Sequence, residues 1–328
     1  MKRIIGIGNA LVDALVTLQD DSLLEEFGLP KGSMTLIGDE EQHRIQQRFA
    51  ALDVHKATGG SAGNTMLALA NLGARPGFIG TIGADETGEF FACNCTAKGI
   101  SPLLSRLAEQ SGIAYTFISP DGERTFATYL GAAAMMRGED LCAEMFAGYD
   151  YLYVEGYLVQ NHELILRAIE LAKQEGLKIC LDLASYNIVA ADHDFFTQLV
   201  SQYIDVVFAN EEEAKAFAGT EPEVALEHLS SLCEVAIVKI GAQGSYVARG
   251  SEKVLAEAWP VAKVLDTTAA GDFYAAGVMY GLMRDYNLQQ CAQIGSLLAG
   301  YVIQAIGSEL PDGAWDEIKL NIDRIVGA

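Results

Sequence analysis

The chain has 328 residues, 50% of them apolar, and a formal net charge of −22 at pH 7. This length and apolar content predict one large α/β domain or two unequal ones, with a sizeable core. The strong negative charge argues against a nucleic-acid partner, because phosphate backbones are bound by clustered Lys and Arg side chains. We interpret the acidity as a solubility feature.

The N-terminal segment MKRIIGIGNALVDALV differs from a signal peptide. Asn9 and Asp13 interrupt its apolar run, and no small-residue cleavage site follows. The sequence has no apolar stretch long enough to predict a membrane span. Its six cysteines lack the spacing of a metal site or a redox motif. We therefore expect a cytoplasmic protein with buried, reduced thiols.

Short apolar runs alternate with helical patterns along most of the chain. The clearest helix is expected over 161–175, with Asn161 as its cap and Gly176 at its end. Two apolar helices are expected between about 271 and 306. Strands that alternate with helices predict a parallel sheet covered on both faces. Buried strands are expected over residues 4–8, 151–156, 178–184, 205–210 and 235–241.

Two segments interrupt this alternation. Residues 13–58 contain more polar strand-like pieces and short helices. Residues 112–131 have the pattern of a hairpin, with Asp121-Gly122 at the turn. We expect both to belong to a small β-rich subdomain inserted into the α/β body.

Two glycine-rich segments resemble motifs of other enzyme classes. GIGNAL (6–11) begins like a dinucleotide-binding fingerprint, but Leu11 stands where the third Gly belongs. GGSAG (59–63) matches the nucleophile elbow of serine hydrolases. The sequence offers few suitable triad partners for Ser61, because the last histidine, His228, lies in a helical pattern. A serine hydrolase is therefore a weaker alternative.

Two other segments together suit a kinase that lacks a P-loop. TTAAGD (267–272) offers small residues at a helix start, where backbone amides bind anions, and a carboxylate, Asp272, beside them. ANEEEA (209–214) follows a predicted strand and offers oxygen ligands for Mg²⁺. Each segment also has a purely structural interpretation, as a helix start with acidic residues in its first turn.

Five motifs in chain order resemble the PfkB, or ribokinase-like, kinase family. They are GGSAGN (59–64), GTIGADETGEFF (80–91), the N-x-x-E pair in NEEE (210–213), VKIGAQGSY (238–246) and DTTAAGD (266–272). The resemblance implies a three-layer α/β/α fold with a central, mostly parallel sheet and a small β-rich lid. The lid would be 13–58 and 112–131, and the large domain would be 1–12, 59–111 and 132–328.

The resemblance also implies a role for each matching residue. Asp272 would take the proton from the substrate hydroxyl, and the helix dipole should favour its ionised form. The preceding amides would form the anion hole, at Ala269, Ala270 and Gly271. Substrate hydroxyls would bind to Asn9, Asp13, Gly60 and Asn64. The nucleotide would bind at Lys239, Gly241 and Gly244. Asn210 and Glu213 would organise Mg²⁺ through water and phosphate.

One position departs from the family pattern, which is usually D-T-x-G-A-G-D. Ala269 replaces the first Gly of G-A-G-D. If the backbone there requires a positive φ, Ala is strained. If Gly serves only for close approach, a methyl group can fit. Anion binding uses the amide, which Ala retains.

The substrate is less clearly indicated. GNALVD (8–13) and GERTFATYLGAA (122–133) are similar to segments of adenosine kinases, in which an Arg matching Arg124 reaches the transferred phosphate. Without that resemblance, Arg124 is interpreted as a surface charge on a hairpin. The pattern favours a ribonucleoside phosphorylated at its 5′-hydroxyl. The alternative is a sugar kinase for ribose, fructose or 2-keto-3-deoxygluconate, and a non-catalytic binding module is a weaker one.

The resemblance further implies ATP and Mg²⁺. Many relatives also use K⁺, near the positions of Asp266 and Ser308. No membrane or nucleic-acid partner is expected, and the oligomeric state would be a monomer or a lid-paired homodimer.

Overall fold

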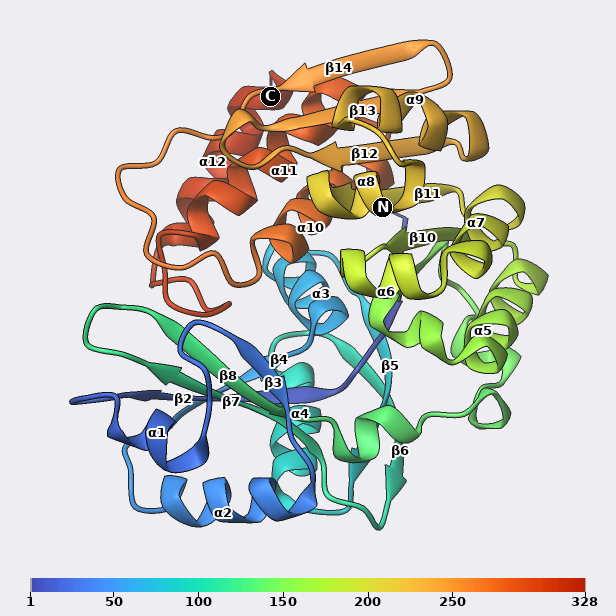
Figure 1. Ribbon diagram of the computed structural model, residues 1–328. Coiled ribbons are helices and arrows are strands. Elements are labelled where there is room, and N and C mark those ends of the chain that lie inside the picture. Colours follow the sequence, from blue (N-terminus) through green and yellow to red (C-terminus); the bar gives the residue numbers. More distant parts are fainter. Residues whose placement is uncertain (1, 328) are drawn as a thin grey trace.

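The computed structural model describes residues 2–327, which form two sheets (Figure 1). The larger sheet contains, in spatial order, β14 (Glu252–Ala256), β13 (Ser245–Arg249), β12 (Val235–Lys239), β11 (Val206–Asn210), β10 (Lys178–Asp182), β9 (Tyr151–Glu155), β1 (Ile4–Ile7), β5 (Gly77–Gly83) and β6 (Ser101–Leu107). The strands from β12 to β6 pair in parallel, whereas β13 and β14 are antiparallel to their neighbours. The expected mostly parallel sheet is confirmed.

Helices cover both faces of this sheet, because successive strand side chains enter opposite cores. On β1, Ile4 belongs to one apolar cluster and Ile5 to the other. The first cluster includes side chains from α3 (Ser61–Asn71), α4 (Glu86–Ala97), α10 (Ala270–Met283), α11 (Leu288–Val302) and α12 (Ala314–Val326). The second includes side chains from α5 (His162–Gln174), α6 (Tyr186–Ala191), α7 (His193–Gln202), α8 (Glu211–Ala218) and α9 (Pro222–Leu232). This is the three-layer α/β/α fold that the sequence predicts.

The smaller sheet lies below the larger one in Figure 1 and is partly covered by two helices. Its strands, in spatial order, are β3 (Met34–Leu36), β8 (Arg124–Tyr129), β7 (Gly112–Ile118), β2 (Leu11–Thr17) and β4 (His55–Gly59). The helices are α1 (Ser22–Phe27) and α2 (Asp39–Phe49). Ala14 and Val16 of β2 pack in the core beneath these helices. Leu11 and Asp13, on the opposite face of the same strand, line a cavity.

Helix α10 is held close to α11 by glycines. A Cβ atom at Gly277 would lie 2.5 Å from the backbone oxygen of Ile294, so no larger residue fits there. From Phe273 onward every residue of α10 is buried. This packing fixes the position of the N-terminus of α10, which lies at the cavity described below.

Some local expectations need correction. The strand expected over 178–184 ends at Asp182, because Ala184 adopts a left-handed backbone with φ of 62°. All six cysteines are free, but Cys93 and Cys142 are exposed and Cys233 is only half-buried, rather than buried as expected. The described residues also form five short 3₁₀ helices: η1 (Gly131–Met135), η2 (Gly138–Asp140), η3 (Ala143–Met145), η4 (Gly156–Gln160) and η5 (Gly241–Gln243). Within residues 2–327, no helix has both the length and the apolar character needed to cross a bilayer.

Candidate active site

A cavity of about 840 Å³ lies between the two sheets. Residues at the carboxyl ends of β9, β10, β11 and β12 line it, which is where open α/β sheets place their ligands. The N-termini of α3 and α10 also reach it, and β2, β3 and β8 of the smaller sheet supply further lining residues.

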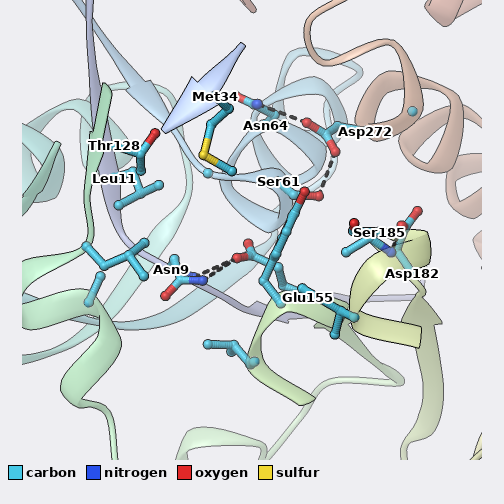
Figure 2. Close-up of a pocket in the computed structure, with 18 of the residues that line it drawn as sticks. Asn9, Leu11, Met34, Ser61, Asn64, Thr128, Glu155, Asp182, Ser185 and Asp272 are labelled. Atoms are coloured by element: carbon cyan, nitrogen blue, oxygen red, sulfur yellow. Dashed lines mark hydrogen bonds between the residues drawn. The ribbon is translucent and has the colours of Figure 1, made fainter. Parts of the chain in front are cut away.

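Asp272 lies in the first turn of α10 and faces this cavity (Figure 2). Ser61 Oγ donates a hydrogen bond to Asp272 Oδ1 at 2.6 Å, and Asn64 Nδ2 donates one to Oδ2 at 2.9 Å. Burial raises the pKa of Asp272 to about 6, although the two hydrogen bonds act in the opposite direction. The expected dipole effect does not prevail, because burial outweighs it. At neutral pH the carboxylate is still mostly ionised and can accept a proton.

Ala269 immediately precedes α10 and has a left-handed backbone, with φ of 60° and ψ of 6°. The position therefore demands the conformation that Gly adopts without strain. No side chain caps the helix at this point. The amide of Ala270 donates to the carbonyl of Thr267 at 3.2 Å. The next amides, those of Gly271 and Asp272, lie in the first turn, where helical N–H groups lack intrahelical partners.

Arg124 connects the smaller sheet to the loop before α10. Its Nη1 lies 2.6 Å from Asp266 Oδ2 and donates to Thr268 Oγ1 at 3.3 Å. The side chains of Arg124 and Asp266 are only 9% and 4% exposed, so the interpretation of Arg124 as a surface charge is wrong. Its Nη2 is buried and has no hydrogen-bond partner in the described part of the chain. The N–H groups of this nitrogen therefore remain available.

Asn9 and Gly60 meet around a buried carboxylate, Glu155. Asn9 Nδ2 donates to Glu155 Oε1 at 2.6 Å, and the amide of Ala62 donates to Oε2 at 3.0 Å. Burial raises the pKa of Glu155 to about 7. Gly60 has φ of 81°, and a Cβ atom there would lie 2.3 Å from the backbone oxygen of Asn9. Sequence reasoning missed Glu155, whose one signal is an acidic residue that ends an apolar strand.

Asp13 projects from β2 into the cavity. Burial and the charge of Asp272 raise its pKa to about 7, while Arg124 acts to lower it. Gly59 leaves the space that this carboxylate fills, because a Cβ atom there would lie 2.2 Å from Asp13 Oδ1. The Asp13 carboxylate is thus a hydrogen-bond acceptor held in a narrow space.

Asn210 and Glu213 close the N-terminus of α8 by a reciprocal cap. Glu213 Oε2 accepts from the Asn210 amide, and Asn210 Oδ1 accepts from the Glu213 amide, both at 2.8 Å. Burial raises the pKa of Glu213 to about 7, against the lowering effect of Lys239. Both residues line the cavity.

Lys239 pairs with a second carboxylate that the sequence analysis missed. Its Nζ donates to Asp182 Oδ2 at 3.2 Å. Burial acts to lower the pKa of Lys239, but Asp182 and Glu213 outweigh that effect and raise it. Asp182 ends β10, and its Oδ1 accepts from the amide of Ala184, which has the left-handed backbone noted above.

Gly241 and Gly244 do not line the cavity, unlike Lys239. They lie at η5, where Gly244 has φ of 102° and a Cβ atom would lie 1.9 Å from the backbone oxygen of Ala256. The backbone alone therefore requires Gly244, whatever it binds.

The side chains that line the cavity are suitable for binding an Mg²⁺ ion that is already coordinated by a nucleotide. Within residues 2–327, no group of three or more His, Cys, Asp or Glu side chains could hold a metal ion by itself. Mg²⁺ at phosphoryl-transfer sites is commonly held by one or two carboxylates together with substrate phosphates. The Glu213 carboxylate, at the cavity wall, matches that requirement.

The residues do not fit K⁺ at Asp266. The Asp266 carboxylate already pairs with Arg124 and also accepts the amides of Gly307 and Thr268, at 2.8 and 3.0 Å. Among residues 2–327, the buried Ser308 hydroxyl has no hydrogen-bond partner. One free hydroxyl is too few side-chain ligands for a bare cation, and the nearby negative charge is already neutralised by a guanidinium.

The arrangement around Ser61 also differs from a serine hydrolase. Its hydroxyl donates to a carboxylate, and no His is among the residues that line the cavity in the described part of the chain. The general base that a nucleophilic serine needs is therefore missing.

Comparison with known proteins agrees with this geometry. The family model "pfkB family carbohydrate kinase" matches residues 30–313. The solved structure of an adenosine kinase from Sinorhizobium meliloti is 34% identical, with a TM-score of 0.86, covering 98% of this chain and 99% of that one. A probable sugar kinase from Rhizobium etli CFN 42 is 31% identical, also with a TM-score of 0.86, covering 98% of both chains.

A curated relative, the guanosine-inosine kinase of Escherichia coli K12, is 27% identical over 263 residues. The match covers 76% of this chain, and the chain spans only 60% of that protein's length. The relatives thus act on nucleosides or sugars, and the family model covers most of the chain. This chain belongs to the pfkB family of carbohydrate kinases.

Proposed function

We propose that this kinase transfers the γ-phosphoryl group of ATP to the 5′-hydroxyl of an adenosine-like ribonucleoside. The observation that carries the proposal is the mixed character of the cavity. Met34 and Leu36 on β3 are 54% and 61% exposed, and both line it together with Leu11 and Phe126. A nucleobase can cover this apolar surface, whereas a free sugar offers mainly hydroxyl groups. The 34% identity to an adenosine kinase over nearly the whole chain supports the same choice.

The sugar part of the substrate binds at the polar floor of the cavity. Asp13 accepts hydrogen bonds from a vicinal diol, since a carboxylate has two acceptor oxygens. The backbone at Gly60 and the side chains of Asn9 and Asn64 complete this region. The anchoring of Asn9 by Glu155 pre-organises it.

Phosphoryl transfer takes place beside the N-terminus of α10. The bond from the acceptor oxygen to the γ-phosphorus forms as the bond to the bridging oxygen of ADP breaks, and Asp272 takes the hydroxyl proton. The amides of Ala269, Gly271 and Asp272, which line the cavity, and the Nη2 of Arg124 stabilise the charge on the transferred group. The expected contribution of the Ala270 amide is not retained, because that amide donates to the carbonyl of Thr267. Lys239 contacts the nucleotide phosphates. Glu213 and Asn210 would hold Mg²⁺ together with the nucleotide phosphates, and the ion would supply further positive charge there.

The smaller sheet acts as a lid in this proposal, with boundaries near residues 13–58 and 112–131. It supplies Asp13, Arg124 and the apolar side chains that cover the acceptor. Its closure excludes water, which limits ATP hydrolysis. We also propose a cytoplasmic location. A monomer or a lid-paired homodimer stays a prediction that light scattering can decide.

A panel of acceptors tests the substrate. The enzyme is incubated with ATP, Mg²⁺ and adenosine, inosine, guanosine, ribose, fructose or 2-keto-3-deoxygluconate, and ADP release and phosphorylated product are measured. We expect the nucleosides to give the highest kcat/KM. Turnover of the free sugars or the sugar acid alone would overturn the nucleoside proposal in favour of the sugar-kinase alternative.

A further inference from the structure

One face of α3 holds Asp272 through three side chains. Ser61 and Asn64 donate to the two carboxylate oxygens, at 2.6 and 2.9 Å, and Thr65 Oγ1 donates to the backbone oxygen of Asp272 at 3.2 Å. These residues are spaced i, i+3 and i+4, which places them on the same side of a helix. Figure 2 shows Ser61 and Asn64 converging on Asp272.

The N-terminus of α3 is itself fixed, so Ser61 is not a freely rotating surface serine. The amide of the next residue, Ala62, donates to the buried Glu155 carboxylate at 3.0 Å. Gly60, before the helix, has a positive φ of 81°, and its backbone lies against that of Asn9. Ser61 therefore presents its hydroxyl from a rigid support.

The charges around Asp272 make its ionised form hard to maintain. The charge of Lys239 lowers the pKa of Asp272, whereas that of Asp182 raises it. The carboxylates of Asp13 and Glu155 are also near enough for the charge of Asp272 to raise their pKa values. Without strong donors, a carboxylate among these neighbours takes up a proton and can no longer act as a base.

We propose that Ser61 is a positioning residue for Asp272. Its hydroxyl fixes one carboxylate oxygen towards the substrate and holds the carboxylate in the form that accepts a proton, while Asn64 fixes the other oxygen. This inference rests on the proposed function, since positioning matters only if Asp272 is the base. It gives a role to the serine of the elbow-like GGSAG motif, which has none once the hydrolase interpretation is rejected.

The first test measures Asp272 itself and needs no activity. The carboxyl ¹³C signal of labelled aspartate is titrated in the wild type and in Ser61→Ala, with Asp272→Asn to assign it. We expect Ser61→Ala to raise the pKa of Asp272 by roughly one unit, the size of one lost hydrogen bond to a charged group. Ser296→Ala is the control, because Ser296 is a buried serine whose hydroxyl has no hydrogen-bond partner among the described residues. An unchanged titration in Ser61→Ala would overturn the proposal.

The second test compares pH–rate profiles. With a pKa raised by about one unit, Ser61→Ala should lose roughly eightfold more rate at pH 5.5 than at pH 8.5, in kcat rather than in KM. Ser61→Thr, which keeps the hydroxyl, should restore the wild-type profile. A loss equal at all pH values would indicate a merely structural serine. A shifted titration in an enzyme that phosphorylates no acceptor would instead defeat the proposed function, although it would still show that Ser61 holds Asp272 in its ionised form.

Discussion

Two helices begin at the same cavity with acidic residues in their first turns, yet they begin differently. At α8, Asn210 and Glu213 cap each other, so the side chains satisfy the end of the helix internally. At α10, no side chain caps the helix, and it starts from a left-handed alanine. The backbone amides of an uncapped helix N-terminus can bind an anion. A helix whose first residues cap each other instead presents a carboxylate to the cavity. In the proposed function, α10 is therefore the helix that would bind the phosphoryl group and α8 the one that would face the metal.

The strongest test of this difference between α10 and α8 removes the carboxyl charges of Asp272 and Glu213 one at a time. We expect Asp272→Asn to lower kcat by about 10²–10⁴-fold, the usual contribution of a general base, with nucleotide affinity nearly unchanged. Glu213→Gln should instead raise the Mg²⁺ concentration needed for half-maximal rate, with a smaller loss of kcat at saturating Mg²⁺. Steady-state kinetics and calorimetry with ATP measure both.

Asp316→Asn serves as the control for these variants, because Asp316 is exposed in the first turn of α12. It removes a first-turn charge from a helix that does not reach the cavity and should leave the rate unchanged. Near wild-type turnover in Asp272→Asn would show that another group takes the proton. Equal kinetic behaviour of Asp272→Asn and Glu213→Gln would show that the two helix starts do not have separate roles.

A smaller effect is expected at the backbone of Ala269. Because φ is 60° there, Ala269→Gly should raise the free energy of unfolding by about 1 kcal/mol. Ala270→Gly, one position into the helix, should lower it by about 0.5–1 kcal/mol, since glycine is unfavourable in a helix. Urea unfolding measures both variants. If Ala269→Gly proves destabilising, the left-handed start of α10 is not strained. The N-termini of α10 and α8 would then not differ in backbone strain.

The sequence was informative where a function depends on residues close together in the chain. The strand ends, the cap at α8 and the sequence around Asp272 are local patterns, and the structure places Asp272, Lys239, Asn210 and Glu213 at one cavity as expected. The strain at Ala269 was a question the sequence could raise but not decide, because φ depends on how α10 packs.

Contacts between distant segments could not be predicted in the same way. Ser61 and Asp272 are 211 positions apart, and nothing local distinguishes a serine that donates to the base from an elbow nucleophile. Glu155 and Asp182 are single acidic residues at strand ends, which become informative only when the sheet order brings them beside Asn9 and Lys239. Sequence patterns therefore predicted the N-termini of the helices better than the side-chain contacts between distant segments.

The smallest expected effect concerns the loop that leads into α10. Since Arg124 already neutralises Asp266, we expect the wild-type rate to change less than about twofold when K⁺ is replaced by Na⁺ or tetramethylammonium at constant ionic strength. Arg124→Gln removes the guanidinium and leaves a buried carboxylate unpaired, so its residual rate should respond to K⁺ although the wild type does not. A wild-type rate that K⁺ alone raises tenfold would mean that Arg124 leaves Asp266 during turnover. The start of α10 would then be organised by an exchangeable ion instead of by the smaller sheet.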